Sequence, residues 1–267
     1  MIKNILAEIV QHKITEVANA KQEISEEQLK CSPYFSREII SLRKNLSQNE
    51  HSGIIAEFKR KSPSKGWINQ YADVKQVTND YTKYGASCLS VLTDTKFFGG
   101  SNQDLLTARE NAISILRKDF IIDEYQLLEA KSIGADVILL IAACLSPERT
   151  KELAKFAKDL GLEILLELHG EEELIHICEE VDFVGVNNRN LKTFEVDVDN
   201  SIKIMKSLPN NKFCIAESGI DNAEVLIQLK QAGFKGFLIG EFFMKNSDPG
   251  AAFKDYIKQI KLLEHES

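Results

Sequence analysis

From residue 54 onward, two patterns of hydrophobic and polar positions alternate along the chain, one typical of strands and one typical of helices. Short runs of aliphatic and β-branched residues are each followed by a loop and then by apolar residues at helical spacing. One helical stretch covers 146–160, with Ser146 as N-cap and Pro147 at the first helical position. Another covers 221–232 and ends at Gly233. Alternating strands and helices predict a parallel sheet.

Eight β-rich runs can be counted in this part of the chain. They are 54–59, 88–93, 115–118, 136–142, 163–168, 183–187, 213–217 and 236–239. Eight such units favour closure into an α/β (β/α)8 TIM barrel over a doubly wound open sheet. The G-x-G-x-x-G fingerprint of dinucleotide-binding open sheets does not follow the first run, which lowers that alternative further.

The first 50 residues have a different pattern. One helical face carries Ile2, Ile5, Leu6, Ile9 and Val10, and helix-compatible sequence continues until a Ser-Pro pair at 32–33. An apolar face of this kind needs a partner. We therefore expect residues 1–50, the N-terminal extension, to pack on a barrel formed by 51–267 as one domain overall, and to lie over the barrel's catalytic mouth.

Composition narrows the function classes. The net charge of -7 and the pI of about 5.4 disfavour a nucleic-acid partner, because phosphate-backbone binding needs a dense basic surface. No run reaches the roughly 18 apolar residues of a membrane span, and Glu8 interrupts the apolar core that a signal peptide would need. The five cysteines include no C-x-x-C pair and predict free thiols, with Cys88, Cys144 and Cys214 buried in strands. The chain is expected in the cytoplasm.

Polar side chains end several of the predicted strands. In GIIAEFKRKSPSKG (53–66), alternation places Glu57 and Lys59 on one face of the first strand. The active site of a barrel of this type lies at the carboxyl ends of the strands. The strand-end candidates are Glu57, Lys59, Lys118, Glu167, Asn187, Arg189, Glu217 and Ser218. Each alone also fits a solvated loop, but their joint occurrence favours acid–base chemistry.

Two further patterns indicate a phosphorylated ligand with a flat apolar part. Ser218-Gly219 and Gly240 stand where barrels bind anions after strands 7 and 8, although these glycines also suit tight turns. Phe98 and Phe120 could hold a ring, with core packing as the alternative. The five histidines have no ligand spacing, and only His169 lies near the mouth, where a loop role is expected. No metal and no cofactor are predicted.

The chain resembles the indole-3-glycerol phosphate synthases of tryptophan biosynthesis. The matching segments are AEFKRKSPSKG (56–66), LTDTKFFGGS (92–101), LRKDFIIDEYQL (116–127), LLELH (165–169), VGVNNRNL (184–191), IAESGI (215–220) and GFLIG (236–240). The resemblance implies a carboxy-lyase that needs neither cofactor nor metal. Its substrate would be 1-(2-carboxyphenylamino)-1-deoxyribulose 5-phosphate, converted to indole-3-glycerol phosphate with loss of carbon dioxide and water.

The resemblance also implies residue roles. Lys118 corresponds to the general acid of ring closure, Glu167 to the general base of dehydration, and Lys59 to the group that engages the substrate carboxylate. The residues that position the sugar and the lysines are Glu57, Asn187, Arg189 and Glu217. Substrate and phosphate contacts correspond to Ser62, Ser218, Gly219, Gly240 and Glu241, and Phe98 and Phe120 stay the substrate-binding candidates named above. The division of acid roles between Lys59 and Lys118 stays open.

One departure from the family and two rival functions are weighed. Some relatives have a small polar residue at the position of Glu241, and because a carboxylate would repel phosphate, only its backbone is expected to contribute. A phosphoribosylanthranilate isomerase would require a Cys and Asp pair, and a barrel that only binds a phosphorylated ligand would have no use for paired proton-transfer groups. A monomer is expected, with a weak dimer as the alternative.

Overall fold

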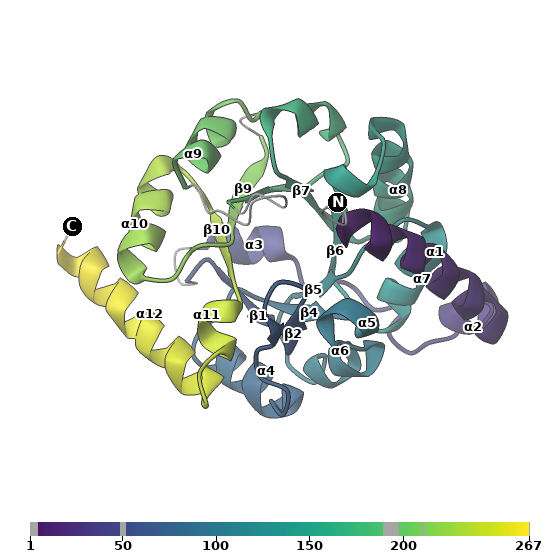
Figure 1. Cartoon of the computed structure of the whole chain (residues 1–267), viewed down its shortest axis with the longest axis horizontal. Helices are drawn as coiled ribbons and strands as arrows, with labels where there is room; N and C mark the ends of the chain where they lie inside the picture. Colours follow the sequence, from purple (N-terminus) through teal and green to yellow (C-terminus); the bar gives the residue numbers. More distant parts are fainter. Residues whose placement is uncertain (1–4, 49–51, 189–197, 210, 267) are drawn as a thin grey trace.

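The computed structural model describes residues 5–48, 52–188, 198–209 and 211–266. Eight parallel strands close into a barrel in the order β1-β10-β9-β8-β7-β6-β5-β4 (Figure 1). They are β1 (Ile54–Phe58), β4 (Cys88–Leu92), β5 (Ile115–Lys118), β6 (Val137–Ile141), β7 (Glu163–Leu168), β8 (Phe183–Asn187), β9 (Phe213–Glu217) and β10 (Gly236–Ile239). The predicted TIM-barrel fold is confirmed.

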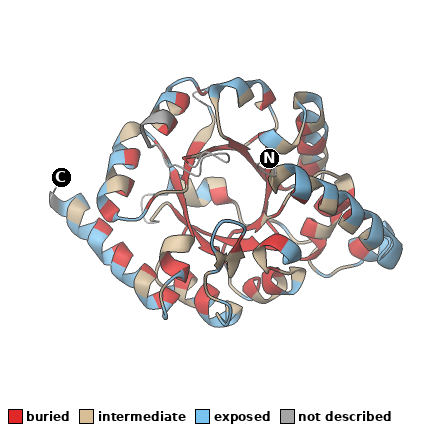
Figure 2. Ribbon diagram, viewed as in Figure 1, coloured by how far each residue is buried: buried red, intermediate tan, exposed pale blue. Residues whose placement is uncertain are grey.

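Helices surround the strands, with their outer faces exposed and the strands buried (Figure 2). They are α4 (Val74–Lys83), α6 (Asn102–Ala108), α7 (Glu124–Ser132), α8 (Pro147–Asp159), the 3-10 helix η2 (Glu171–His176), α9 (Val198–Lys206), α10 (Ala223–Ala232) and α12 (Pro249–Glu266). Ser146 caps α8 as predicted, whereas the cap of α10 is Asn222, so this helix begins later than the predicted 221. Gly233 ends α10 with a left-handed φ of 116°.

Short elements occupy the loops at the strand ends. They are the hairpin strands β2 (Lys61–Ser62) and β3 (Gly66–Trp67), the helices α5 (Thr95–Phe98) and α11 (Glu241–Met244), and the 3-10 turn η1 (Ala142–Cys144). The sequence predicted only a loop after β1, because two-residue strands leave no periodic pattern. The prediction of a buried Cys144 is wrong, since this free thiol lies in η1 and is partly exposed.

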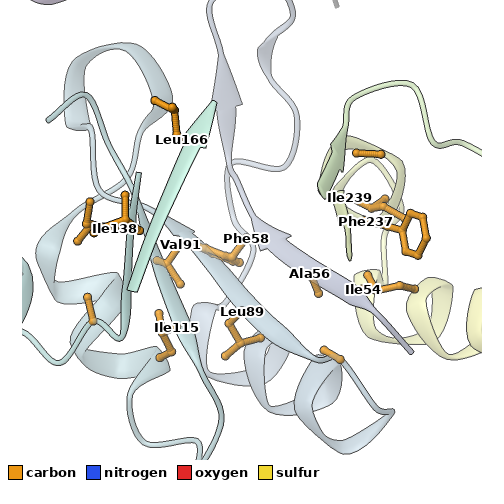
Figure 3. Packing of buried hydrophobic residues seen from close by; sticks show 14 of the residues in the cluster. Ile54, Ala56, Phe58, Leu89, Val91, Ile115, Ile138, Leu166, Phe237 and Ile239 are labelled. Carbon is orange, nitrogen blue, oxygen red and sulfur yellow. The ribbon is translucent and has the colours of Figure 1, made fainter. Parts of the chain in front are cut away.

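Two apolar cores explain the inward and outward faces of the strands. Ile54, Ala56 and Phe58 of β1 point outward into the layer between barrel and helices (Figure 3). Ile55 points into a second cluster that fills the barrel interior. Since side chains alternate along a strand, Glu57 has the inward parity of Ile55 and emerges above this interior cluster.

The N-terminal extension reaches both ends of the barrel. Its described helices are α1 (Ile5–Glu23), α2 (Glu26–Lys30) and α3 (Leu42–Ser47). The beginning of α1 lies at the carboxyl ends of the strands, where it lines a pocket. Leu42 of α3 joins the interior cluster at the opposite end, and its N–H donates to Glu163 Oε2, 2.7 Å away, at the start of β7. The expectation that the extension lies over the mouth therefore describes α1 but not α3, and the predicted contact of Ile2 lies outside the described residues.

Within the described ranges, no helix combines the length and the apolar character that crossing a membrane requires.

Candidate active site

A pocket of about 430 Å³ opens at the carboxyl ends of the barrel strands. Its wall includes the following candidates from the sequence: Glu57, Lys59, Ser62, Phe98, Lys118, Phe120, Glu167, Asn187, Glu217, Ser218, Gly219, Gly240 and Glu241. Arg189 lies outside the described residues. The structure thus brings every described candidate to one cavity, although they come from seven different strands and their loops.

Strand register explains why the central side chains meet. Lys118, Asn187 and Glu217 are the last residues of β5, β8 and β9, and Glu167 is the penultimate residue of β7. Asn187 pairs with Glu217 across neighbouring strands. In a closed parallel barrel, residues at the same level and with inward parity converge on the axis, so these side chains share the pocket floor.

Lys118 is the centre of the charged group. Its Nζ lies 2.8 Å from Glu167 Oε2 and 3.4 Å from Glu217 Oε2. Burial lowers the pKa of Lys118, but Glu167, Glu217 and Glu57 together raise it more, so its pKa lies above the ordinary value. Lys118 is therefore an ammonium at neutral pH, the form that can donate a proton.

The two carboxyls beside Lys118 have opposite protonation tendencies. Burial raises the pKa of Glu167, but Lys118 and His169 outweigh burial and hold it well below its usual range. Burial raises the pKa of Glu217 to about 8, with Lys118 opposing and Glu167 and Glu57 adding to the rise. At neutral pH, Glu167 is an ionised base while Glu217 is largely protonated. Such separation of neighbouring carboxyl groups is typical of acid–base sites.

Glu57 and Lys59 form a second ion pair in the wall. Lys59 Nζ lies 2.7 Å from Glu57 Oε1, and Ser90 Oγ donates to Glu57 Oε2 at 3.3 Å. A Cβ added at Gly240 would come within 2.6 Å of Glu57 Oε1, and one at Gly185 within 2.2 Å of Glu217 Oε1. These glycines leave room for the carboxyl groups. Sequence reasoning missed Ser90 and Gly185, since a small residue inside a strand carries no signal of what approaches it.

His169 lies in the loop after β7, as expected, and this loop position is part of the pocket wall. Its Nε2 lies 3.3 Å from Glu167 Oε1, and its Nδ1 lies 3.7 Å from Glu173 Oε2. Burial lowers the pKa of His169, but the two glutamates raise it to about 10. The available signal was its position two residues after Glu167, which gives both side chains the same parity.

An aromatic pair forms part of the wall. Phe98 and Phe120 follow β4 and β5, and their ring centroids are 5.8 Å apart at an angle of 38°. Both rings are partly exposed to the pocket rather than sealed in the core. Ile5, Leu6 and Ile9 of α1 add apolar surface to the same cavity. This part of the pocket suits a flat, apolar ring.

Backbone geometry marks a second part of the wall. Ser218 and Gly219 are consecutive left-handed residues, with φ of 66° and 70°. For a residue other than glycine this conformation costs about 1 kcal/mol or more, and it persists where the surrounding structure imposes it. Gly240 N-caps α11, and Lys245 lines the wall after this helix. Sequence reasoning missed Lys245, which stands one helical turn after Glu241.

No group of three His, Cys, Asp or Glu side chains among the described residues is arranged to hold a metal ion. The chemistry that the described side chains offer is proton transfer between a lysine ammonium and glutamates, beside an aromatic pair.

Comparison with known proteins agrees with this arrangement. The sequence model of the indole-3-glycerol phosphate synthase family matches residues 6–256. The indole-3-glycerol phosphate synthase of Bacteroides thetaiotaomicron is 51% identical over 261 residues, covering 97% of this chain and 100% of that protein. Its counterpart in Bordetella pertussis is 38% identical, covering 93% of this chain and 97% of that protein.

Solved structures of lower similarity share the fold. The alpha subunit of tryptophan synthase from Legionella pneumophila has a TM-score of 0.62 and 13% identity, covering 85% of this chain and 98% of that one. This similarity supports the barrel alone. The family match over nearly the whole chain and the two close relatives carry more: the chain belongs to the indole-3-glycerol phosphate synthase family.

Proposed function

We propose that this chain converts 1-(2-carboxyphenylamino)-1-deoxyribulose 5-phosphate to indole-3-glycerol phosphate, releasing one carbon dioxide and one water. The observation that carries the proposal is the ammonium of Lys118, 2.8 Å from Glu167 and 3.4 Å from Glu217, in a pocket that also holds Phe98 and Phe120. An aromatic wall beside a proton donor and a base is what ring closure on an aniline-type substrate requires.

Lys118 is the proposed acid of ring closure. The aromatic carbon that bears the carboxylate attacks the ribulose carbonyl carbon, and negative charge builds on the carbonyl oxygen. The Lys118 ammonium donates a proton to that oxygen, which becomes a hydroxyl. Carbon dioxide then leaves from the attacking ring carbon, and the electron pair of the broken carbon–carbon bond returns to the ring and restores its aromaticity. Lys59, paired with Glu57 at 2.7 Å, is the proposed contact of the substrate carboxylate before it leaves.

Glu167 is the proposed base of the dehydration. The new hydroxyl leaves as water after protonation, and a carboxylate removes a proton from the neighbouring carbon so that the indole double bond forms. The pKa of Glu167 lies well below its usual range, so it is in the ionised form that this step needs. Lys59 and Lys118 remain alternative donors to the leaving hydroxyl. Asn187, whose Nδ2 donates to Glu167 Oε1 at 3.0 Å, orients the base.

The remaining candidates are proposed to hold the substrate. Backbone N–H groups of the left-handed pair Ser218-Gly219 and of the start of α11 would bind the phosphate, which does not involve the Glu241 side chain. Lys245 adds a positive charge to this wall. Phe98 and Phe120 would contact the anthranilate ring. Ser62, Glu57, Glu217 and Arg189 are proposed to position the sugar, carboxylate and lysines.

The reaction has a direct test. Adding the proposed substrate to the purified chain should produce indole-type fluorescence together with one equivalent of carbon dioxide. Fluorescence without carbon dioxide, or substrate binding without turnover, would contradict the proposal, and the latter would favour a barrel that only binds phosphorylated ligands.

The phosphate site has a separate test. Inorganic phosphate should compete with substrate, and Gly219→Val should raise KM about tenfold or more, because a side chain would strain the left-handed turn and cover its N–H groups. Gly85→Val is the matched control, since Gly85 also has a left-handed φ of 98° but does not line the pocket. Equal effects of the two substitutions on KM would show that backbone strain alone is responsible.

We further propose that residues 1–50 and 51–267 fold as one domain, and that the chain acts as a cytoplasmic monomer without a nucleic-acid partner, a weak dimer being the alternative. The interior position of Leu42 supports the first point, and the net charge of -7 supports the exclusion of nucleic acid. A single unfolding transition, sedimentation mass, cell fractionation and a nucleic-acid binding assay would test these points in turn.

A further inference from the structure

A lysine of the N-terminal extension is buried among carboxylates from the barrel. Lys13 is 0% exposed and lies on the face of α1 that also buries Ile9 and Val17. Its Nζ is 3.0 Å from Asp94 Oδ2, 2.9 Å from Asp119 Oδ1 and 2.8 Å from Glu16 Oε1. Burial lowers the pKa of Lys13, but Asp119, Asp94 and Glu16 raise it by more than burial lowers it. The pKa therefore lies above its ordinary value and the side chain remains charged.

Asp94 connects this lysine to one wall of the pocket. It follows β4 and is the N-cap of α5, where its Oδ1 accepts the backbone N–H groups of Phe97 at 2.7 Å and Phe98 at 3.2 Å. Lys13 contacts the other carboxylate oxygen. The orientation of α5, which carries Phe98, therefore depends on the Asp94 carboxylate, and Lys13 of α1 fixes the position of this carboxylate through its second oxygen.

Asp119 connects the same lysine to the proposed general acid. It directly follows Lys118, and its Oδ1 both contacts Lys13 and accepts the N–H of Phe120 at 2.8 Å. Its other oxygen accepts from Thr93 and lies 3.3 Å from Arg117. Burial raises the pKa of Asp119, but Lys13 and Arg117 lower it more, so it stays ionised. Asp119 thus fixes the backbone between Lys118 and Phe120.

We propose that Lys13 is a positioning residue for ring closure: by holding Asp94 and Asp119 together, it sets the spacing of Phe98 and Phe120 and the approach of Lys118. The inference rests on the proposed function, which it deepens. Without Lys13, the buried carboxylates of Asp94 and Asp119 would lose the positive charge that lies between them. They would repel each other, and the loops after β4 and β5 would separate. The extension would then act on catalysis through one buried contact rather than only by covering the pocket.

The chain contains a matched control for an ion pair that only anchors α1. Lys21 lies two turns further along α1, and its Nζ is 2.8 Å from Asp123 Oδ1. Asp123 caps α7 and does not line the pocket, and the Lys21 side chain is 45% exposed. Lys21→Met therefore removes a link between α1 and the far end of the loop that carries Phe120, while the contacts of Lys13 with Asp94 and Asp119 stay in place.

The first measurement compares Lys13→Met with Lys21→Met in the full-length chain. Misplacement of reacting groups by about 1 Å can cost about 100-fold, so Lys13→Met should lower kcat/KM by about 10- to 100-fold. Lys21→Met should stay within about twofold of the parent, because exposed pairs contribute little. Equal losses in the two variants would overturn the proposal, since they would show that Lys13 only anchors the helix.

The second measurement is a double-mutant cycle, which gives the coupling between Lys13 and the aromatic pair in kcat/KM. If Lys13 has a purely structural role, this coupling is absent. In a Phe98→Ala/Phe120→Ala background, Lys13→Met should cost clearly less than in the parent, because only its effect on Lys118 remains. A loss as large as in the parent would overturn the proposal. If Lys13→Met does not fold, Lys13→Gln keeps an N–H donor group without the charge and replaces Lys13→Met in the cycle. Failure of both variants to fold would make Lys13 a core residue and overturn its positioning role.

The same experiments separate this inference from the proposed function. An inactive parent chain would overturn the function and the inference with it. An active parent in which Lys13 and the aromatic pair act independently would overturn the inference alone.

Discussion

The two ends of the barrel contain buried carboxyl groups in opposite situations. At the amino end, Asp136 Oδ1 accepts from Arg37 at 2.6 Å and from the Ile40 N–H at 2.8 Å. Its Oδ2 accepts from Arg109 at 2.6 Å and from the Ile115 N–H at 2.8 Å. At the carboxyl end, Glu217 Oε2 is 3.4 Å from Lys118, while Oε1 has no hydrogen-bond partner within the described part of the chain.

This difference separates charges that stabilise the fold from charges that are arranged for a ligand. A buried carboxylate with four donors is stable where it is, whereas one that keeps an unpartnered oxygen costs folding free energy. The pKa of Glu217, raised to about 8, expresses that cost. Sites that transfer protons commonly tolerate such a cost, because the substrate completes the missing interactions.

The largest expected effect is on turnover at the carboxyl end. Lys118→Ala should reduce kcat by about 10²–10⁴-fold, because one positioned acid is lost. The fold should persist, since Glu217 can remain protonated once the ammonium is gone. Steady-state kinetics and circular dichroism would check this, with exposed Lys83→Ala as the control. Near-normal turnover in a folded variant would remove Lys118 from the mechanism.

The opposite result is expected at the amino end. Asp136→Asn should lower the free energy of unfolding by about 3–5 kcal/mol, because Arg37 and Arg109 lose the charge that both of them pair with. The kcat of the molecules that remain folded should not change. Urea unfolding and active-site titration would measure the two quantities separately. A stable variant with impaired kcat would end the division between the two ends.

The same carboxyl-to-amide substitution in the pocket should raise the free energy of unfolding relative to the parent at high pH, whereas Asp136→Asn lowers it. The folded-state pKa of Glu217 is raised to about 8, so its bound proton stabilises the fold fully below about pH 4.3, the usual unfolded value. That stabilisation is lost as the pH rises to 8. Relative to Glu217→Gln, the parent should therefore lose on the order of 4 kcal/mol of unfolding free energy between pH 4.3 and 8. A difference that does not vary with pH would show that Glu217 is not protonated in the fold.

The fold was largely readable from the sequence, because its information is local and periodic. The apolar runs predicted all eight barrel strands to within a residue or two, and the cap at Ser146 and the terminator at Gly233 marked the ends of two helices. The hairpin β2-β3 was missed, since two-residue strands have no period. The position of α1 over the mouth was predicted, but the position of α3 at the opposite end was missed, because an apolar stripe does not show against which partner a helix packs.

The site was readable where a polar residue ends an apolar strand, as Lys118 and Glu217 do, and where an aromatic residue or a glycine follows such a strand. Side chains whose role depends on distant partners gave no such signal. Lys13 looks like an ordinary helix lysine until α1 is placed against Asp94 and Asp119. The sequence places His169 in a loop near the mouth, but it does not show that the imidazole lies between Glu167 and Glu173. These contacts are long-range and depend on tertiary packing.

The smallest expected effect concerns His169 and would sharpen the contrast between the ends. The imidazole has a pKa of about 10 between Glu167 and Glu173, so it is positively charged at neutral pH, and together with Lys118 it helps to lower the pKa of Glu167. Glu217, the other carboxyl group beside Lys118, is largely protonated at neutral pH and therefore carries little charge. In His169→Gln the pKa of Glu167 should rise, so the acid limb of the kcat/KM profile should move toward neutral pH.

The size of that effect is limited because Lys118 remains. We expect kcat to fall by about three- to tenfold at the acid end of the profile and by less at neutral pH, because Glu167 takes up its proton at a higher pH than in the parent. His176→Gln is the control: this buried histidine lies 3.0 Å from the carbonyl oxygens of Glu173 and Leu145 and does not line the pocket. It should lower stability and leave the pH profile in place. If the two variants shift the profile equally, His169 supports the wall as His176 does, and its charge has no role in keeping Glu167 ionised.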